Sequence, residues 1–477
     1  MKKLRLGYAP TRRFTFSAED AYKYKVLIRE KMESFNLAID IVDLEGLNEE
    51  GLLYNDLYNA NEIVEYFKKE KIDAVFFPHC NFGTEDVVAR AAKELGLPTL
   101  LWGPRDEAPL ENGMRLRDTQ CGLFATGKVL RRFNVPFTYI TNSRVDDPVF
   151  ERGFKNFIAA ANVVKEFKKI RILQIGPRPT SFWTMMCNEG ELLEKFGVEI
   201  HPINIEDIKR ASEKEIKRDT KELAEAIEYI KTNLEAIDVT DDDIKKIASL
   251  KAAMKRMAQE NQCNAIAIQC WSSLQDTMGI MPCLANAILT DEQIPVTCET
   301  DIHGAITSIM VQAATLNTLP TFFADLTIRH PENDNGELLF HCGNFPVSLS
   351  IEEQPRLERH FLFDDHSPGT HEGQIKGANE MTIARFDGDH GEYSLFLGKC
   401  KETTGPFTRG SYIWVEVNDW PLWEEKLVTG PYVHHAVGIN ANVIPVLFEA
   451  CKYIPGLTPD PVDPTEDEIK AWLRGSY

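Results

Sequence analysis

The chain opens with short apolar runs that alternate with longer stretches in which apolar residues recur every three or four positions. The runs have the length of buried strands, and the longer stretches have the period of amphipathic helices. This alternation predicts a parallel, doubly wound sheet with helices on its faces. The expected strands lie at residues 3–10, 37–46, 72–79 and 97–104, and the clearest helices lie at residues 20–35 and 83–96.

A second series of the same kind begins near residue 169. Between its strands, residues 207–260 are dense in Lys and Glu with helical spacing, which is typical of surface helices. The series therefore predicts a second α/β domain. Its expected strands lie at residues 170–179, 198–204, 264–271, 294–300 and 319–326.

The pattern changes near residue 336 to strand-like segments separated by Gly, Asp and Asn turns. This texture predicts an antiparallel sheet or barrel, and Asp387-Gly388 is a hairpin signal within it. A last helix is expected near residues 466–475. We therefore predict an α/β protein with domains at residues 1–168, 169–335 and 336–477, the third of them mostly β.

Composition narrows the class of protein. The 477 residues exceed one ordinary core, and 43% hydrophobic with 26% charged residues is typical of a folded, soluble protein. No apolar run approaches the ~18 residues that span a membrane, and no apolar region follows the two N-terminal lysines, which argues against a signal peptide. The net charge of -20 argues against a nucleic-acid surface, and ten cysteines without a regular framework are typical of reduced, intracellular thiols. The expectation is a cytoplasmic, multidomain protein that binds neither membranes nor nucleic acids.

Acids and imidazoles occupy several positions where a buried strand would carry apolar residues. Glu299 follows one expected strand, Asp325 ends another, and His341 interrupts a third. Further along the chain, His434 and His435 lie in or just before a strand. Carboxylate oxygens with one or two imidazoles suit a divalent ion such as Mn²⁺, Mg²⁺, Zn²⁺ or Co²⁺. The sequence thus contains candidate metal ligands.

Each of these residues also has a simpler structural explanation. An Asp at a strand end is commonly a cap or turn former, and His341 could be a hydrogen-bonded core histidine. Adjacent histidines in a strand point to opposite faces, and the spacing matches no general rule such as HExxH. Asp301, two residues after Glu299, is best explained as a charge or cap at the N-terminus of a helix.

From about residue 262 to 345 the chain resembles the L-fucose isomerase and L-arabinose isomerase superfamily. The resemblance rests on "AIQCWSSLQ", "CETDIHGA", "LPTFFADL" and "LFHCGNFP", with "HHAV" further downstream. The order and separation of these motifs are similar, whereas the N-terminal third matches in pattern more than in motif. The resemblance implies two Rossmann-like α/β domains followed by an antiparallel β-barrel-like domain, and a homo-oligomer that is often a hexamer.

The resemblance also implies roles for individual residues. Glu299 corresponds to the glutamate that binds the metal and exchanges protons with the sugar, and Asp325 to the second acidic ligand. His435 corresponds to the histidine ligand, while His341 corresponds to a ligand in arabinose isomerases only. The expected cofactor is Mn²⁺, with other divalent cations as alternatives. Such enzymes interconvert an aldose and a ketose through a cis-enediol.

Arginines follow several of the expected strands. Arg12, Arg13 and Arg178 lie in strand-end turns, as does Arg105, which is notable in a chain of net charge -20. Arginine matches carboxylate, phosphate or sulfonate oxygens. The alternative is that these arginines pair with Asp and Glu at subunit contacts.

Aromatic and amide side chains lie beside these turns. Trp183, Gln269 and Trp271 have the chemistry of sugar contacts, although a tryptophan after a buried strand is also a common packing residue. Together with His434 and the arginines Arg12, Arg13 and Arg178, they form the candidate substrate-binding set.

The sequence therefore predicts a metal-dependent aldose–ketose isomerase acting on a free monosaccharide. Because some members of the superfamily act on the sulfonated hexose sulfoquinovose, and the arginines would match its charge, an anionic hexose is the candidate substrate. L-fucose, D-arabinose and L-arabinose are the neutral alternatives. A non-catalytic sugar-binding protein on the same scaffold is the alternative from another class. A nucleotide enzyme is disfavoured because no GxGxxG or GxxxxGK[ST] follows an expected strand.

Overall fold

The computed structural model describes residues 3–53, 57–363 and 366–475. The chain forms two compact units. The first comprises Met1–Lys165, Glu449–Ile454 and Glu466–Tyr477, and the second comprises Glu166–Phe448 and Pro455–Thr465. The three domain ranges expected from the sequence stay a prediction.

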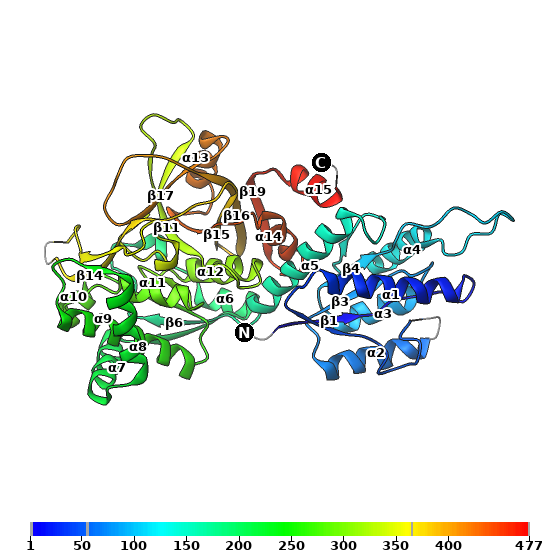
Figure 1. Ribbon diagram of the computed structural model, residues 1–477, viewed down its shortest axis with the longest axis horizontal. Helices are drawn as coiled ribbons and strands as arrows, with labels where there is room; N and C mark the ends of the chain where they lie inside the picture. Colours follow the sequence, from blue (N-terminus) through cyan, green and yellow to red (C-terminus); the bar gives the residue numbers. More distant parts are fainter. Residues whose placement is uncertain (1–2, 54–56, 364–365, 476–477) are drawn as a thin grey trace. The chain divides into compact units, whose positions relative to one another are not determined.

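The first unit is built on a five-stranded parallel sheet in the order β2-β1-β3-β4-β5. The expected parallel sheet with helices around it is therefore confirmed (Figure 1). Its strands are β1 (Leu4–Tyr8), β2 (Ile39–Val42), β3 (Ala74–Pro78), β4 (Thr99–Trp102) and β5 (Thr138–Tyr139). Its helices are α1 (Ala18–Ser34), α2 (Leu57–Glu70), α3 (Glu85–Leu95), α4 (Thr119–Arg132), α5 (Pro148–Phe167) and α15 (Glu466–Arg474), and the unit boundary at residue 448 falls within α14 (Ile444–Cys451).

The C-terminal part of the chain returns to this first sheet. The hydroxyl of Thr138 in β5 donates to Glu449 (2.5 Å) and lies 2.7 Å from the hydroxyl of Tyr453. Tyr453 in turn donates to the backbone oxygen of Thr99 in β4 (3.0 Å). These buried hydrogen bonds explain why residues so late in the sequence belong to the N-terminal unit.

The second unit contains a smaller parallel sheet in the order β10-β9-β6-β7. The charge-rich segment 207–260 forms three of its helices, α7 to α9, as expected. The strands are β6 (Arg171–Ile175), β7 (Glu199–Ile203), β9 (Ala265–Ile268) and β10 (Val296–Thr297). The helices are α6 (Glu189–Phe196), α7 (Ile205–Arg218), α8 (Lys221–Asn233), α9 (Asp241–Glu260), α10 (Ser273–Met278), α11 (Cys283–Asp291) and α12 (Ile302–Ala314), with the 3₁₀ turns η1 (Trp183–Met185) and η2 (Val347–Leu349).

The remaining strands form a ten-stranded sheet, and pairing of β16 with β17 closes part of it into an antiparallel barrel. The barrel expected after residue 336 is confirmed. The strands are β8 (Glu235–Ala236), β11 (Phe322–Arg329), β12 (Gly336–His341), β13 (Arg356–Arg359), β14 (Pro368–Gln374), β15 (Met381–Asp389), β16 (Glu392–Thr403), β17 (Ser411–Glu416), β18 (His435–Ile439) and β19 (Leu457–Asp463). Helix α13 (Trp420–Thr429) precedes β18.

Two details of the barrel differ from the sequence expectation. Strand β11 is not part of the parallel sheet but lies antiparallel between β12 and β18, and the apolar, buried start of this strand has the same pattern in either place. The hairpin between β15 and β16 turns at residues 390–391 rather than at Asp387-Gly388. Asp387 stays in the strand because its carboxylate is held by buried partners.

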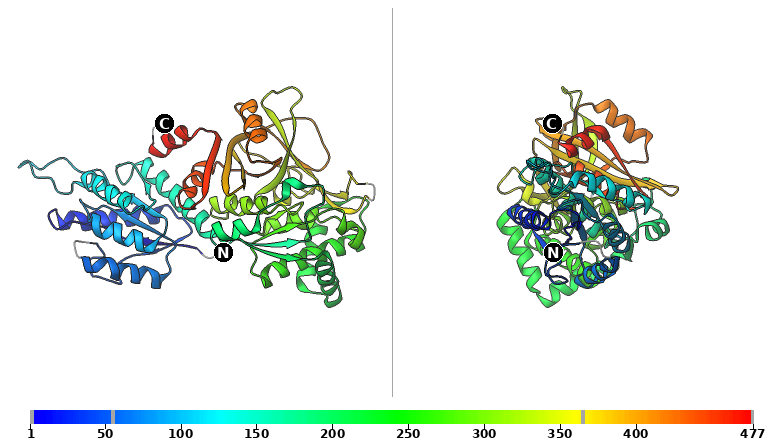
Figure 2. Two further views of the ribbon diagram at one scale, coloured as in Figure 1. Left: turned by 180° about the vertical axis from the view of Figure 1, so that it is seen from behind. Right: turned by 90° about the vertical axis from the view of Figure 1, so that its right-hand side faces the viewer.

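Helix α12 lies between the two sheets of the second unit (Figure 1; Figure 2). It contacts β9 and β10 on one side and β11, β15 and β18 on the other, and every residue from Ile302 to Ala314 is buried. A helix buried on all sides carries apolar or small residues around its whole circumference. Its N-terminus therefore starts in the interior, where the parallel sheet meets the barrel.

The described part of the chain contains no helix long and apolar enough to cross a membrane. All ten cysteines lie within it and are free thiols.

Helix α4 offers a test of how closely the first unit is packed. A Cβ at Gly122 would lie 1.7 Å from the backbone oxygen of Phe82, whereas a Cβ at Gly127 meets nothing nearer than 3.8 Å. We expect Gly122→Ala to destabilise the protein by about 1–3 kcal/mol, since backbone must move. Gly127→Ala, in the same helix, should raise stability by about 0.5–1 kcal/mol through helix propensity. Calorimetric unfolding compares the two, and equal melting temperatures would contradict the packing.

Candidate active site

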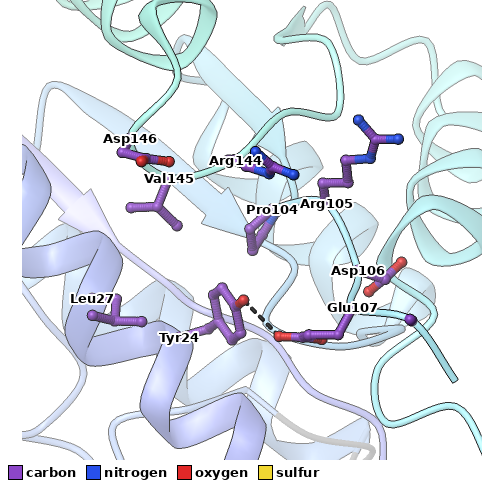
Figure 3. Close-up of a pocket in the computed structure, with 10 residues that line it drawn as sticks. Tyr24, Leu27, Pro104, Arg105, Asp106, Glu107, Arg144, Val145 and Asp146 are labelled. Carbon is purple, nitrogen blue, oxygen red and sulfur yellow. Dashed lines mark hydrogen bonds between the residues drawn. The ribbon is translucent and has the colours of Figure 1, made fainter. Parts of the chain in front are cut away.

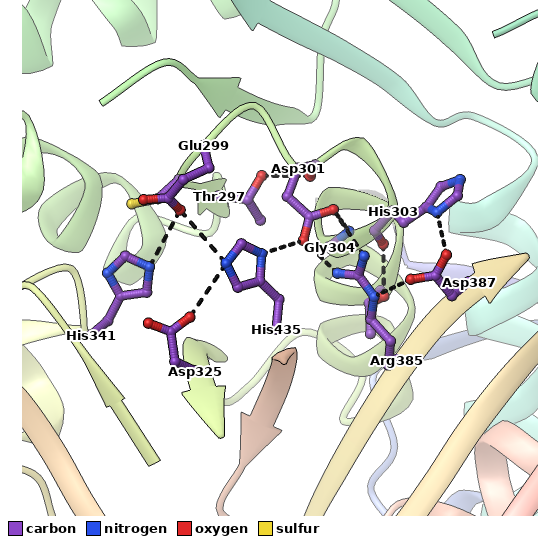
Figure 4. Close-up of polar contacts among 12 residues, drawn as sticks. Thr297, Glu299, Asp301, His303, Gly304, Asp325, His341, Arg385, Asp387 and His435 are labelled. Carbon is purple, nitrogen blue, oxygen red and sulfur yellow. Dashed lines mark hydrogen bonds and ion pairs between the residues drawn. The ribbon is translucent and has the colours of Figure 1, made fainter. Parts of the chain in front are cut away.

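The loop between β10 and α12 carries Glu299. Glu299 and Thr300 both adopt left-handed backbone conformations, with φ of 53° and 59°. This costs energy, especially for a β-branched residue, and such strain is commonly found at functional sites. The loop is held by hydrogen bonds from Thr300 N to Ile268 O (3.1 Å) and from Asp301 N to Cys298 O (3.0 Å). The strained turn directs Glu299 toward two imidazoles (Figure 4).

The structure brings together Glu299, Asp325, His341 and His435, which the sequence analysis selected as metal candidates. His435 Nε2 lies 3.3 Å from Asp325 Oδ1 and 3.8 Å from Glu299 Oε2, and His341 Nε2 lies 3.6 Å from Glu299 Oε2. Glu299, His341 and His435 are buried, while the Asp325 side chain remains 23% exposed. Four residues from four separate elements thus form one cluster with access at Asp325.

The two oxygens of Glu299 have different surroundings. Oε1 accepts hydrogen bonds from the Cys270 thiol (3.2 Å) and the Trp271 indole (3.1 Å), whereas Oε2 is buried without a hydrogen-bond partner. Burial opposes ionisation, but the imidazoles of His341 and His435 and the Cys270 thiol hold the pKa of Glu299 at about 2. Glu299 is therefore a carboxylate that directs one bare oxygen into the cluster.

His435 is held in the tautomer that can act as a ligand through Nε2. Its Nδ1 lies 3.0 Å from Asp301 Oδ2, and a carboxylate can only accept, so Nδ1 carries the ring proton. The lone pair of Nε2 then faces Glu299 and Asp325. A carboxylate behind an imidazole orients metal-binding histidines in the same way.

His341 is held in the opposite tautomer. The backbone N–H of Cys342 donates to its Nδ1 (2.9 Å), so the ring proton lies on Nε2. Burial opposes a charged ring, but Asp325, Cys342 and Glu299 raise the pKa of His341 well above its ordinary value. His341 Nε2 is itself buried without a hydrogen-bond partner, and Glu299, His341 and His435 offer ligand atoms within 4.8 Å of one another, so the metal-ligand role of His341 stays a prediction.

Glu299 Oε2 and Asp325 Oδ1 both face His435 Nε2, and each of the three atoms can supply an electron pair. The two carboxylate oxygens are buried without a hydrogen-bond donor, and unpaired buried acceptors are costly. A divalent cation would satisfy all three, and the set of two carboxylates and one imidazole suits Mn²⁺ and similar ions. The residues present therefore fit a metal centre.

A line of buried charges behind His435 was not expected from the sequence. Asp301 accepts from His435 and pairs with Arg385, whose Nε donates to Asp387 (2.8 Å). His303 Nδ1 lies 2.8 Å from the other oxygen of Asp387 (Figure 4). Burial opposes ionisation of Asp301, but Arg385 and His435 hold its pKa well below the usual range.

The N-cap prediction for Asp301 is confirmed, because its carboxylate accepts from Gly304 N (2.8 Å). The sequence reading missed its second role, the contact with His435. The available signal was Arg385, a charged residue within an apolar strand sequence.

Among the substrate-binding candidates, Trp271 touches Glu299, and His434 lies next to His435 with ring centroids 4.3 Å apart. The Gln269 side chain borders Gly176, and Trp183 is 73% exposed. Arg178 donates to the backbone oxygens of Pro179 and Thr180 in its own loop.

Arg12 and Arg13 belong to the first unit, where they pair with Glu50 and Glu85. The substrate roles of all these residues stay predictions.

Comparison of the sequence with known proteins finds a matching family model and several relatives. A family model described as the N-terminal domain of fucose/sulfoquinovose isomerases matches residues 7–168. Two proteins named sulfoquinovose isomerase, from Priestia aryabhattai and Priestia megaterium, are each 24% identical over 428 residues, which cover 87% of this chain and 90% of the relative. A third, from Alkalicoccus urumqiensis, is 26% identical over 69% of this chain and 72% of its own length.

Together, the family model and these relatives support membership of the fucose isomerase-like superfamily, which confirms the resemblance seen in the motifs. Among solved structures, a periplasmic solute-binding protein from Actinobacillus succinogenes with bound D-allose covers 67% of this chain and 94% of its own. With 12% identity and a TM-score of 0.17, that similarity supports no inference.

The arrangement around Asp301 predicts a specific effect of removing its charge. Asp301→Asn keeps an oxygen for the N-cap but removes the carboxylate that fixes His435, so Mn²⁺ affinity should fall by roughly tenfold to hundredfold. Titration calorimetry of metal-depleted protein measures this. The matched control is Asp387→Asn, which also removes a carboxylate from Arg385 but does not contact His435. Equal Mn²⁺ affinity in the two variants would show that Asp301 does not act through His435.

Proposed function

We propose that the protein is a metal-dependent aldose–ketose isomerase that acts on a free anionic hexose such as sulfoquinovose, with Mn²⁺ as the cation. The observation that carries the proposal is that Glu299 Oε2 and Asp325 Oδ1, both buried without a hydrogen-bond partner, face His435 Nε2. The curated relatives named sulfoquinovose isomerase support both the reaction and the substrate. The resemblance further leads us to propose a cytoplasmic homo-oligomer.

The reaction moves a proton between C1 and C2 of the open-chain sugar through a cis-enediol. In the proposed site Glu299 and Asp325 are the groups that take the proton from one carbon and return it to the other. A divalent cation held by Glu299, Asp325 and His435 would supply Lewis-acid stabilisation of the negative charge that develops on the sugar. The bonds from Cys270 and Trp271 hold Glu299 in a fixed orientation, which lowers the cost of reaching the reactive geometry.

His341 has a different role in this proposal. Its Nε2–H points at Glu299, and the same N–H can donate to a sugar oxygen or to the carboxylate while the proton moves. His435 is the imidazole ligand, and His341 is a hydrogen-bond donor beside it. The two histidines therefore differ in function although both are buried next to Glu299.

The first test concerns the carboxylate. Glu299→Gln should lower turnover by about 10²–10⁴, since an amide cannot accept the proton. The matched control is Glu337→Gln in β12, because burial raises the pKa of Glu337 to about 8 and the native side chain is already mostly neutral at pH 7. Steady-state kinetics of both variants, with circular dichroism to check folding, make the comparison. Turnover of the Glu299→Gln variant near that of the parent would remove Glu299 from the reaction.

The second test separates the histidines. His435→Ala should weaken Mn²⁺ binding by more than about a hundredfold because a ligand is lost. His341→Ala should weaken it by about tenfold or less, as expected for a neighbouring hydrogen-bond donor. Metal titration of each purified variant gives the two affinities. The reverse order would make His341 the ligand and would require its ring to take the other tautomer.

The proposal as a whole is tested by turnover. The Mn²⁺-loaded protein should convert sulfoquinovose to its ketose with a higher kcat/KM than L-fucose, D-arabinose or L-arabinose, and EDTA should abolish the activity. A preference for a neutral sugar would contradict the anionic substrate but keep the isomerase. Binding of sugars without ketose formation from any of them would favour the non-catalytic alternative.

A further inference from the structure

The first unit has a pocket of its own, beyond the carboxyl ends of β4 and β5. Its volume is about 520 Å³, and it is lined by the loops that follow these strands together with Tyr24 and Leu27 of α1 (Figure 3). Carboxyl ends of parallel strands are common places for ligands in open α/β sheets. All of its lining residues belong to the first unit, so the pocket is complete within that unit.

Two arginines enter this pocket from neighbouring loops. Pro104 and Ser143 form a parallel bridge, and Arg105 N donates to Ser143 O (2.8 Å). Arg105 and Arg144 directly follow the two bridged residues, so they lie next to each other in the two loops. Both line the pocket, and both are exposed. The backbone pairing thus places the two arginines side by side at the edge of one pocket.

Neither guanidinium group is neutralised by a residue that the structure describes. Within residues 3–53, 57–363 and 366–475, no carboxylate lies within ion-pair distance of Arg105 or Arg144, and their side chains make no hydrogen bond. Like charges placed together repel each other. In a chain of net charge -20, two unpaired arginines at one pocket are a site where an anion would relieve that repulsion.

A third arginine, Arg117, supports the loop that carries Arg105. The Arg117 side chain is fully buried, stacks on the Tyr24 ring at 3.6 Å, and donates from Nε to Glu107 (2.9 Å). Its Nη2 donates to the backbone oxygen of Arg105 (2.7 Å), which pins the loop that carries Arg105. Arg117 therefore makes the position of Arg105 rigid, so that little order has to be gained on binding.

The carboxylates that line the pocket differ in whether they already have hydrogen-bond partners in the protein. Both oxygens of Asp106 accept from Thr119, and Glu107 accepts from Arg117 and from the Tyr24 hydroxyl (2.6 Å). Asp146 lines the pocket but makes no hydrogen bond or ion pair with any described residue. The groups left for a ligand are therefore two guanidinium groups and one carboxylate, which together favour an oxyanion that also carries hydroxyl groups.

We propose that this pocket binds a hydroxylated organic oxyanion, a sugar sulfonate or a sugar phosphate. Arg105 and Arg144 bind the sulfonate or phosphate oxygens, and Asp146 accepts hydrogen bonds from hydroxyl groups. The inference does not depend on the isomerase activity, because it stands on residues of the first unit alone.

Titration calorimetry with three probes tests the proposal: sulfoquinovose, glucose 6-phosphate and, as the neutral sugar, glucose. Arg105→Gln and Arg144→Gln should each weaken binding of the two anions by about tenfold to a hundredfold and leave glucose unchanged. Higher ionic strength should also lower the affinity for the two anions, because the guanidinium groups are exposed. The matched control is Arg115→Gln, a nearby exposed arginine that pairs with Asp118 and does not line the pocket.

Steady-state kinetics then show whether the anion bound in this pocket is the sulfonated substrate or a separate sugar phosphate. If KM for sulfoquinovose rises in the Arg105 and Arg144 variants while a neutral sugar is turned over as before, the ligand is the sulfonated substrate. If turnover is unchanged while glucose 6-phosphate binding is lost, the ligand is a separate sugar phosphate. Anion affinities equal to the parent in the Arg105→Gln/Arg144→Gln double variant would overturn the proposal. The calorimetric result is readable even in a protein that shows no isomerase activity.

Discussion

The buried carboxylate of Asp301 joins the parts of the second unit that must meet for a site to exist. One carboxylate caps helix α12 through Gly304 N, pairs with Arg385 of β15 and fixes His435 at the start of β18. Burying a charge is costly unless it is compensated by partners of this kind. Because the same two oxygens start the helix, connect it to the barrel and set the tautomer of His435, the fold and the chemistry of the site depend on one group.

Hydrogen bonds from the backbone and from outside the cluster give its members different chemistry. His341 and His435 have the same side chain and similar burial, but Cys342 N–H supplies a donor to one and Asp301 an acceptor to the other. The two oxygens of Glu299 likewise differ, because Oε1 accepts hydrogen bonds and Oε2 has no hydrogen-bond partner. The strained turn at Glu299 leads directly into α12, which is buried on every side, and packing of this kind is what holds a strained backbone in place.

The arginines of the first unit illustrate how tertiary structure sorts residues of one type. Arg12 and Arg13 follow β1 and are engaged by Glu50 and Glu85. Arg105 follows β4 and meets no carboxylate among the described residues, while Arg117, only twelve positions later, is buried as a structural support. Strand-end position alone therefore identifies arginines near a ligand edge but does not say which of them remain available to a ligand.

The sequence by itself determined the architecture of parallel sheets followed by an antiparallel barrel, because apolar periodicity reports local structure directly. It also identified Glu299, Asp325, His341 and His435 as one group, through the motifs of the family. It could not assign β11 to the barrel, since the apolar, buried start of this strand has the same pattern in either sheet. Nor could it distinguish His341 from His435 or find Arg385 behind Asp301. Those differences depend on hydrogen bonds between residues far apart in the chain, so only the tertiary structure decided them.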